Sequence, residues 1–134
     1  VGVVAGTVGC FGGMSIAAAL CSYLIVTREA RLGLNGPQVI EQEAGIDEYD
    51  SRNRPFIWSM TGGEVRFESG LVEALVGDGV NAVKQAVNEA LAKGVPAKHR
   101  TDNYDWYLDR LNNFDTTKQA DSEQIKQLFG EKRA

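Results

Sequence analysis

Apolar positions near the start of the chain form continuous runs rather than an alternating pattern. Val1–Ala5 and Tyr23–Thr27 are such runs, and each predicts a short strand that is buried on both faces. Between them, Gly6–Gly13 predicts a turn, and Met14–Ser22 predicts a buried helix because its residues are apolar all round. The predicted order is therefore strand, glycine turn, helix, strand.

Farther along the chain, apolar residues recur at three- and four-residue spacing, which is typical of amphipathic helices. Asp78–Lys93 is the clearest helix, and Gly94 ends it. Tyr104–Phe114 and Gln124–Phe129 predict two further helices. The apolar stripe expected on the first helix consists of Val80, Val83, Val87 and Leu91. The stripe expected on the second consists of Tyr104, Tyr107, Leu108, Leu111 and Phe114.

The middle of the chain has a weaker pattern. Arg31–Leu34 predicts a short strand, and Pro37 predicts the start of a helix that Gly45 ends. Residues 46–70 look irregular, although Phe56–Met60 is apolar and fits either a short helix or a packing patch. Alternating strands and helices predict an α/β architecture of the ββα superhelix type, with residues 1–95 as its main part and 96–134 as a helical extension.

Composition narrows the class of protein. The chain has 134 residues, 43% of them hydrophobic, which is enough for one core. A net charge of −4 argues against a nucleic-acid surface. Two cysteines, Cys10 and Cys21, are too few for a disulfide framework and lack the spacing of a metal site, so we expect reduced thiols in a cytoplasmic protein and no bound metal.

The first charged residue is Arg28, so Val1–Thr27 is long enough to cross a membrane. The glycines in the middle of this segment argue against a membrane helix, because each costs about 1 kcal/mol relative to alanine. No basic region precedes the segment and no aromatic residues flank both ends. We therefore expect no membrane insertion.

The glycine turn carries the candidate chemistry. Glycine allows a ligand to approach the backbone closely, and bare N–H groups at a helix start favour negative charge. The spacing of these glycines matches neither a dinucleotide-binding motif nor a phosphate loop. We therefore predict that the backbone N–H groups of Gly12 and Gly13 form an oxyanion hole.

A serine hydrolase is an alternative interpretation of the same turn. The residues around Ser15 loosely match a nucleophile elbow, and an aspartate and then His99 follow in the order of a catalytic triad. The last elbow position is Ala17 rather than glycine, however, and His99 lies between Lys98 and Arg100. These features favour a solvated surface histidine.

Two segments resemble a known superfamily. Gly9–Cys21 resembles the glycine-rich A-x-G-G-G-x-x-L-A-x-x-C segment of the crotonase superfamily, and Leu24–Leu34 resembles the strand pair that follows it there. The continuation, Asn35–Gly45, is similar to the G-P-x-V-I-E-Q run of the carboxyltransferase branch. With Thr61–Gly63 and Gly70–Val72, the whole run is most similar to the β subunits of malonate decarboxylases.

This resemblance implies a partial crotonase-like domain that decarboxylates malonyl-S-acyl carrier protein to the acetyl form through an enolate. The substrate would arrive on a phosphopantetheine-type arm, with no cofactor bound in the chain itself. The implied substrate contacts are Gly9, Cys10, Phe11, Met14, Gly36 and Pro37. In hydratases one oxyanion donor lies on an earlier strand, so we expect this chain to be the C-terminal portion of a longer protein.

The departures from the hydratase pattern also matter. Ile16 and Gln38 stand where hydratases place their two catalytic glutamates, so the resemblance implies that hydration chemistry is lost here. The resemblance implies two partners, a second crotonase-like (γ) subunit and the acyl carrier protein. Two alternatives stay open: transfer of the carboxyl group to a biotin protein, and a non-catalytic scaffold subunit.

Overall fold

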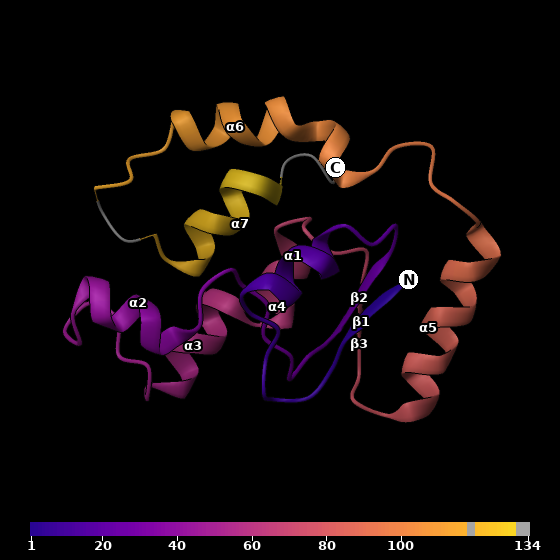
Figure 1. Cartoon of the computed structure of the whole chain (residues 1–134), viewed down its shortest axis with the longest axis horizontal. Coiled ribbons are helices and arrows are strands. Elements are labelled where there is room, and N and C mark those ends of the chain that lie inside the picture. Colours follow the sequence, from indigo (N-terminus) through magenta and orange to yellow (C-terminus); the bar gives the residue numbers. More distant parts are fainter. Residues whose placement is uncertain (118–119, 131–134) are drawn as a thin grey trace.

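The computed structural model describes residues 1–117 and 120–130 and is built around a three-stranded parallel sheet (Figure 1). The strands are β1 (Gly2–Val4), β2 (Leu24–Thr27) and β3 (Ala74–Val76), in the order β1-β2-β3. Val3 pairs with Ile25, and Ile25 pairs with Ala74. The central strand is β2, which is buried along its whole length. Its apolar run therefore behaves as predicted.

Helices lie on both sides of this sheet (Figure 1). Their bounds are α1 (Gly13–Ala19), α2 (Pro37–Ala44), α3 (Arg54–Thr61), α4 (Gly63–Glu68), α5 (Val80–Lys93), the 3-10 helix η1 (Arg100–Asn103), α6 (Tyr104–Asn112) and α7 (Ser122–Gly130). None of these helices, within the described residues, is long and apolar enough to cross a membrane.

Side chains that alternate along β2 produce two separate cores. Leu24 and Val26 pack on one face with Val4, Ala30 and Val72. Ile25 points to the other face, where it packs against Ala86 and Ala90 of α5. The sheet is thus a middle layer between α5 and the remaining helices, which is the α/β arrangement that the sequence predicts.

The expectation of burial on both faces is wrong for β1 and for α1. β1 is an edge strand, and Val3 is 40% exposed. In α1, Met14 and Leu20 are 70% and 64% exposed, and only Ser15 is buried. An apolar pattern all round a helix does not show which of its faces another element covers. In the described chain α1 packs mainly against β1, so its other faces stay exposed.

The segment 46–70, predicted to be irregular, contains two helices: the short helix that Phe56–Met60 fits is confirmed as part of α3, whereas α4 was not predicted. Asn53 caps α3 by accepting a hydrogen bond from Phe56 N–H, and a proline follows the cap. Gly62 and Gly63 join the two helices, and both are closely packed. A Cβ on Gly62 would collide with Trp58 O, and one on Gly63 would collide with Thr27 O.

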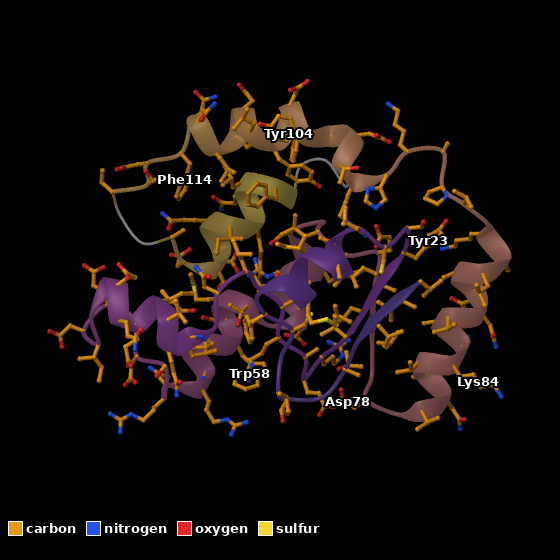
Figure 2. The ribbon with its side chains drawn as sticks, viewed as in Figure 1. Tyr23, Trp58, Asp78, Lys84, Tyr104 and Phe114 are labelled. Atoms are coloured by element: carbon orange, nitrogen blue, oxygen red, sulfur yellow. The ribbon has the colours of Figure 1, made fainter. Side chains whose placement is uncertain are left out.

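The expected apolar stripes of α5 and α6 are also partly wrong. Val80 and Leu91 of α5 are 82% and 64% exposed, and the smaller Ala86 and Ala90 face the sheet instead. Small residues allow the helix to approach the sheet closely. Because alanine is only weakly hydrophobic, the sequence pattern did not identify this face of α5 as the buried one. In α6, Tyr104 is 64% exposed, and it is labelled on the outermost helix in Figure 2.

Helices α6 and α7 lie one above the other at the top of Figure 1, and α7 also contacts α4. The rings of Tyr107 and Phe129 are 5.8 Å apart, and Lys126 pairs with Glu68 at 2.5 Å. The division of the chain at residue 95 stays a prediction, and residues 131–134 of the predicted extension lie outside the described part.

Candidate functional site

The glycine turn is held against the segment 31–34 by backbone hydrogen bonds. Cys10 N–H donates to Arg31 O at 2.9 Å, and Gly33 N–H donates to Cys10 O at 3.1 Å. Gly12 N–H donates to Leu34 O at 2.7 Å. Arg31–Leu34 was expected to be a strand, and it forms isolated bridges instead, one of them between Cys10 and Leu32.

The turn leaves two backbone donors open at the start of α1. Among the described residues, no acceptor receives the N–H of Gly13 or of Met14. A Cβ built on Gly12 or Gly13 would meet no atom within 4 Å, so the space beside the turn is empty. Because Gly12 N–H is already paired with Leu34 O, the two open donors are those of Gly13 and Met14.

Gly12 has a different part in this geometry. Its φ of 66° lies in the left-handed region, where other residues are strained. This conformation turns the chain from the Leu34 hydrogen bond into the first residue of α1. Gly12 therefore sets the direction of the following N–H groups, but its own N–H is bonded to Leu34 O, so of the two predicted donors only Gly13 is open in this structure.

The side chain of Arg31 donates hydrogen bonds to backbone carbonyls of the glycine turn. Its Nε and Nη2 donate to Thr7 O and Val8 O at 3.0 and 2.6 Å. The guanidinium lies over the rings of Phe11 and Trp58, at 5.5 and 4.6 Å from their centroids. Burial lowers the pKa of Arg31, and the neighbouring Arg54 lowers it further. Sequence reasoning missed this residue, because its partners lie more than twenty positions away.

A hollow of about 320 Å³ lies beside the turn. It brings together Phe11, Gly36 and Pro37, three of the predicted substrate contacts. Its lining consists of Val8, Phe11, Arg31, Gly36, Pro37, Gln38, Val39 and Ser51. The structure thus joins the glycine turn and the start of α2 at one surface, which neither segment indicates by itself.

The other predicted contacts do not line this hollow. Gly9 has a φ of 94°, and a Cβ there would collide with the ring of Phe11, so this glycine makes room for the ring. Met14 is exposed, beside the open donors. Cys10 packs against the core, and burial raises the pKa of its thiol, which disfavours a thiolate nucleophile.

The hydrolase alternative is not formed. Ser15 is buried, and its Oγ donates to Gly12 O at 2.6 Å. His99 is partly buried, with its Nε2 at 2.9 Å from Cys21 O and its Nδ1 at 2.8 Å from Thr101 Oγ1. The expectation of a solvated His99 is therefore wrong, and both triad candidates are engaged with other groups.

We expect Ser15→Ala to change the activity that the resemblance implies by no more than about threefold, because its hydroxyl serves only a local hydrogen bond worth about 1 kcal/mol. Steady-state kinetics measures this. A folded Ser15→Ala protein without activity, judged by circular dichroism, would restore the hydrolase interpretation.

Arg100 links the segment after α5 to the end of α1. Its Nη1 donates to Ala19 O and Cys21 O, each at 2.6 Å. Its Nη2 lies 2.6 Å from both oxygens of Glu73, and Glu73 also accepts from Leu24 N–H at 2.6 Å. A cation at the carbonyl end of a helix is favourable, so Arg100 stabilises the scaffold behind the turn.

We expect Arg100→Met to lower the free energy of unfolding by about 2 kcal/mol. The guanidinium, on a side chain that is only 14% exposed, would no longer bind Glu73 and the carbonyl oxygens of Ala19 and Cys21. Urea denaturation measures the loss. Arg28→Met is the matched control, since Arg28 and Glu64 are each 60% exposed and such a pair contributes about 0.5 kcal/mol. Equal losses in the two variants would contradict the linking role of Arg100.

Comparison with known proteins places this geometry in a family. No model of a known protein family matches the sequence. The malonate decarboxylase hetero-tetramer of Pseudomonas, solved in complex with malonate, contains a chain that is 61% identical, with a TM-score of 0.90 over 95% of this chain. The chain belongs to the crotonase-like carboxyltransferase superfamily. A Pseudomonas hetero-dimer of the same enzyme matches 83% of the chain at 58% identity, with a TM-score of 0.71.

Two more distant members extend the superfamily relationship. The malonyl-S-ACP:biotin-protein carboxyltransferase of Malonomonas rubra is 37% identical over 93 residues, which is 69% of this chain. The transcarboxylase 12S structure matches 66% of the chain at 28% identity, with a TM-score of 0.53. This chain spans 46% of the hetero-tetramer subunit and 29% of the Malonomonas protein. The predicted crotonase-like partial domain is thus confirmed.

Within the described residues, no group of three histidine, cysteine, aspartate or glutamate side chains could hold a metal ion.

Proposed function

We propose that this chain belongs to the subunit of a malonate decarboxylase that decarboxylates malonyl-S-acyl carrier protein. The observation that carries the proposal is the pair of open donors at Gly13 and Met14, next to empty space. The 61% identity to a chain of the Pseudomonas malonate decarboxylase supports the substrate class.

The reaction needs charge stabilisation rather than a nucleophile. As the bond between the α-carbon and the carboxylate breaks, carbon dioxide leaves and the electron pair collects on the thioester oxygen as an enolate. Two N–H donors about 3 Å from that oxygen stabilise the charge more than they stabilise the neutral thioester. Protonation of the α-carbon then yields the acetyl thioester.

The side chains around the turn suit this chemistry better than hydration. Ile16 and Gln38 replace the two catalytic glutamates of the hydratases, and Gln38 lines the hollow beside Phe11. Without a carboxylate to activate it, water has no general base at this position. The hollow with Phe11, Gly36 and Pro37 would receive the phosphopantetheine-type arm of the carrier protein.

A partner subunit completes the proposal. The solved Pseudomonas relatives are a hetero-tetramer and a hetero-dimer. We propose that a second crotonase-like (γ) subunit covers the exposed stripe of α6, formed by Tyr104, Leu108 and Leu111. The apolar patch Phe56–Met60 packs within the chain instead, because Ile57 is buried and the ring of Phe56 contacts Tyr49.

A second candidate function is transfer of the carboxyl group to a biotin protein. The observation that favours it is the 37% identity to the Malonomonas carboxyltransferase. The same enolate would form in both reactions, so the donors at Gly13 and Met14 serve either one. The two functions differ only in whether the carboxyl group is released or accepted.

The test combines the full-length subunit with its partner subunit and malonyl carrier protein. Decarboxylation releases acetyl thioester without any biotin protein, whereas carboxyl transfer requires the biotin protein and carboxylates it. Absence of acetyl thioester under both conditions would leave only a non-catalytic scaffold and would overturn the proposal.

A further inference from the structure

Arg66 of α4 is a partly buried cation without an anionic partner. Its Nε donates to Leu32 O at 2.8 Å, and among the described residues no acceptor receives the N–H groups of its two Nη atoms. Burial lowers the pKa of this guanidinium, which nevertheless keeps its charge at neutral pH. Because the guanidinium is only partly buried and makes no ion pair among the described residues, its Nη groups can still bind an anionic ligand.

The nearby carboxylates are engaged elsewhere. On the same helix, Glu64 pairs with Arg28 at 2.7 Å, and Glu68 pairs with Lys126 at 2.5 Å. Glu73 is bound to Arg100 and to Leu24 N–H. Tyr49, the other titratable group whose charge acts on Arg66, is a buried phenol whose own pKa is raised by burial. None of these three carboxylates pairs with Arg66.

The cation lines a second hollow, which is separate from the one beside Phe11. This hollow has a volume of about 260 Å³ and lies beneath α1. Its apolar wall includes four leucines from different parts of the chain: Leu24, Leu32, Leu34 and Leu71. Arg100 also reaches it, but the Nη atoms of Arg100 already bind two carbonyls and Glu73. The free positive charge of this hollow is therefore that of Arg66.

We propose that the hollow between α1 and α4 binds a short aliphatic carboxylate, with its charged end on the Nη atoms of Arg66 and its hydrocarbon part against the leucines. A planar guanidinium binds a carboxylate through two parallel hydrogen bonds. Apolar walls favour a ligand with a hydrocarbon body over a hydrated inorganic anion. Because this ligand need not react, the proposal does not depend on decarboxylation.

The test titrates the full-length protein with butyrate and follows binding by isothermal titration calorimetry and by the Nε–H signal of Arg66 in NMR. We expect saturable binding, a shift of that signal, and no binding of the neutral isostere butyramide. Sodium chloride and inorganic phosphate should compete weakly. Butyramide binding as tight as butyrate, or an Arg66 signal that does not move, would overturn the proposal.

Two variants test separately the contribution of the Arg66 charge and that of the hollow's volume to butyrate binding. Arg66→Met should raise the dissociation constant of butyrate at least about tenfold, because it removes the charged donors and keeps apolar bulk. Ala19→Leu should weaken binding similarly by filling the hollow while leaving Arg66 in place. Arg28→Met, on the exposed pair with Glu64, is the control and should bind butyrate like wild type. Unchanged binding in both hollow variants would contradict this site.

Discussion

Gly13→Val is expected to lower kcat for malonyl thioester decarboxylation by the assembled full-length enzyme by about a hundredfold or more. A Cβ at Gly13 meets no protein atom within 4 Å, so the new side chain would occupy the empty space beside the turn. The thioester oxygen could then no longer approach the N–H groups of Gly13 and Met14. Steady-state kinetics on malonyl carrier protein measures the loss.

The same geometry predicts that Gly13→Val keeps its fold. The residue lies at the first position of α1 without a left-handed φ, so valine is sterically tolerated there. Gly79→Val is the matched control, since Gly79 also lies at the start of a helix without a left-handed φ, has open space for a Cβ and lies away from the site. A Gly13→Val enzyme with wild-type kcat would exclude the proposed oxyanion role of this backbone.

Gly63→Ala is expected to destabilise the protein by about 3 kcal/mol, which is large for the addition of one methyl group. The new Cβ would collide with the carbonyl oxygen of Thr27 and lie 3.3 Å from Val26 Cγ2. Both residues belong to β2, the buried central strand, so neither can move aside easily. Urea denaturation of the full-length protein measures the change.

Comparison with Gly79→Ala isolates this steric effect, because both substitutions add the same atoms and only one of them meets backbone. Gly79→Ala should change the free energy of unfolding by about 1 kcal/mol or less. If both variants unfold at the same urea concentration, the close contact between α4 and β2 does not exist in solution.

The parts of the fold that were predictable have strong local signals. The β-branched run at β2 indicates a strand buried on both faces, and Pro37 and Gly45 mark the two ends of α2. In contrast, α4 is only six residues long, begins at Gly63 and contains Val65 and Phe67, so propensity alone does not favour a helix there, and Phe56–Met60 of α3 fits a packing patch as well as a helix. α4 packs against β2 and β3, whereas α3 packs against α4 and is capped by Asn53.

The candidate site also has parts that the sequence indicated and parts that only the fold revealed. The glycine turn was recognisable from its composition, and so was the start of α2. Their meeting at one hollow was not, because Phe11 and Pro37 are brought together by the bridge between Cys10 and Leu32. Arg66 gave no signal at all in the sequence, since its lack of a partner is visible only once every neighbouring carboxylate has been placed.

By itself, the sequence determined the order of strand, turn and helix and the resemblance to carboxyltransferases. Tertiary structure alone decided which N–H groups stay open, because Gly12 is paired with Leu34 across the turn. It also decided that Arg100 holds Cys21 O, 79 residues away. The physical reason is that local propensity acts over a few residues, whereas a hydrogen-bond partner is chosen by whatever the folded chain brings within about 3 Å.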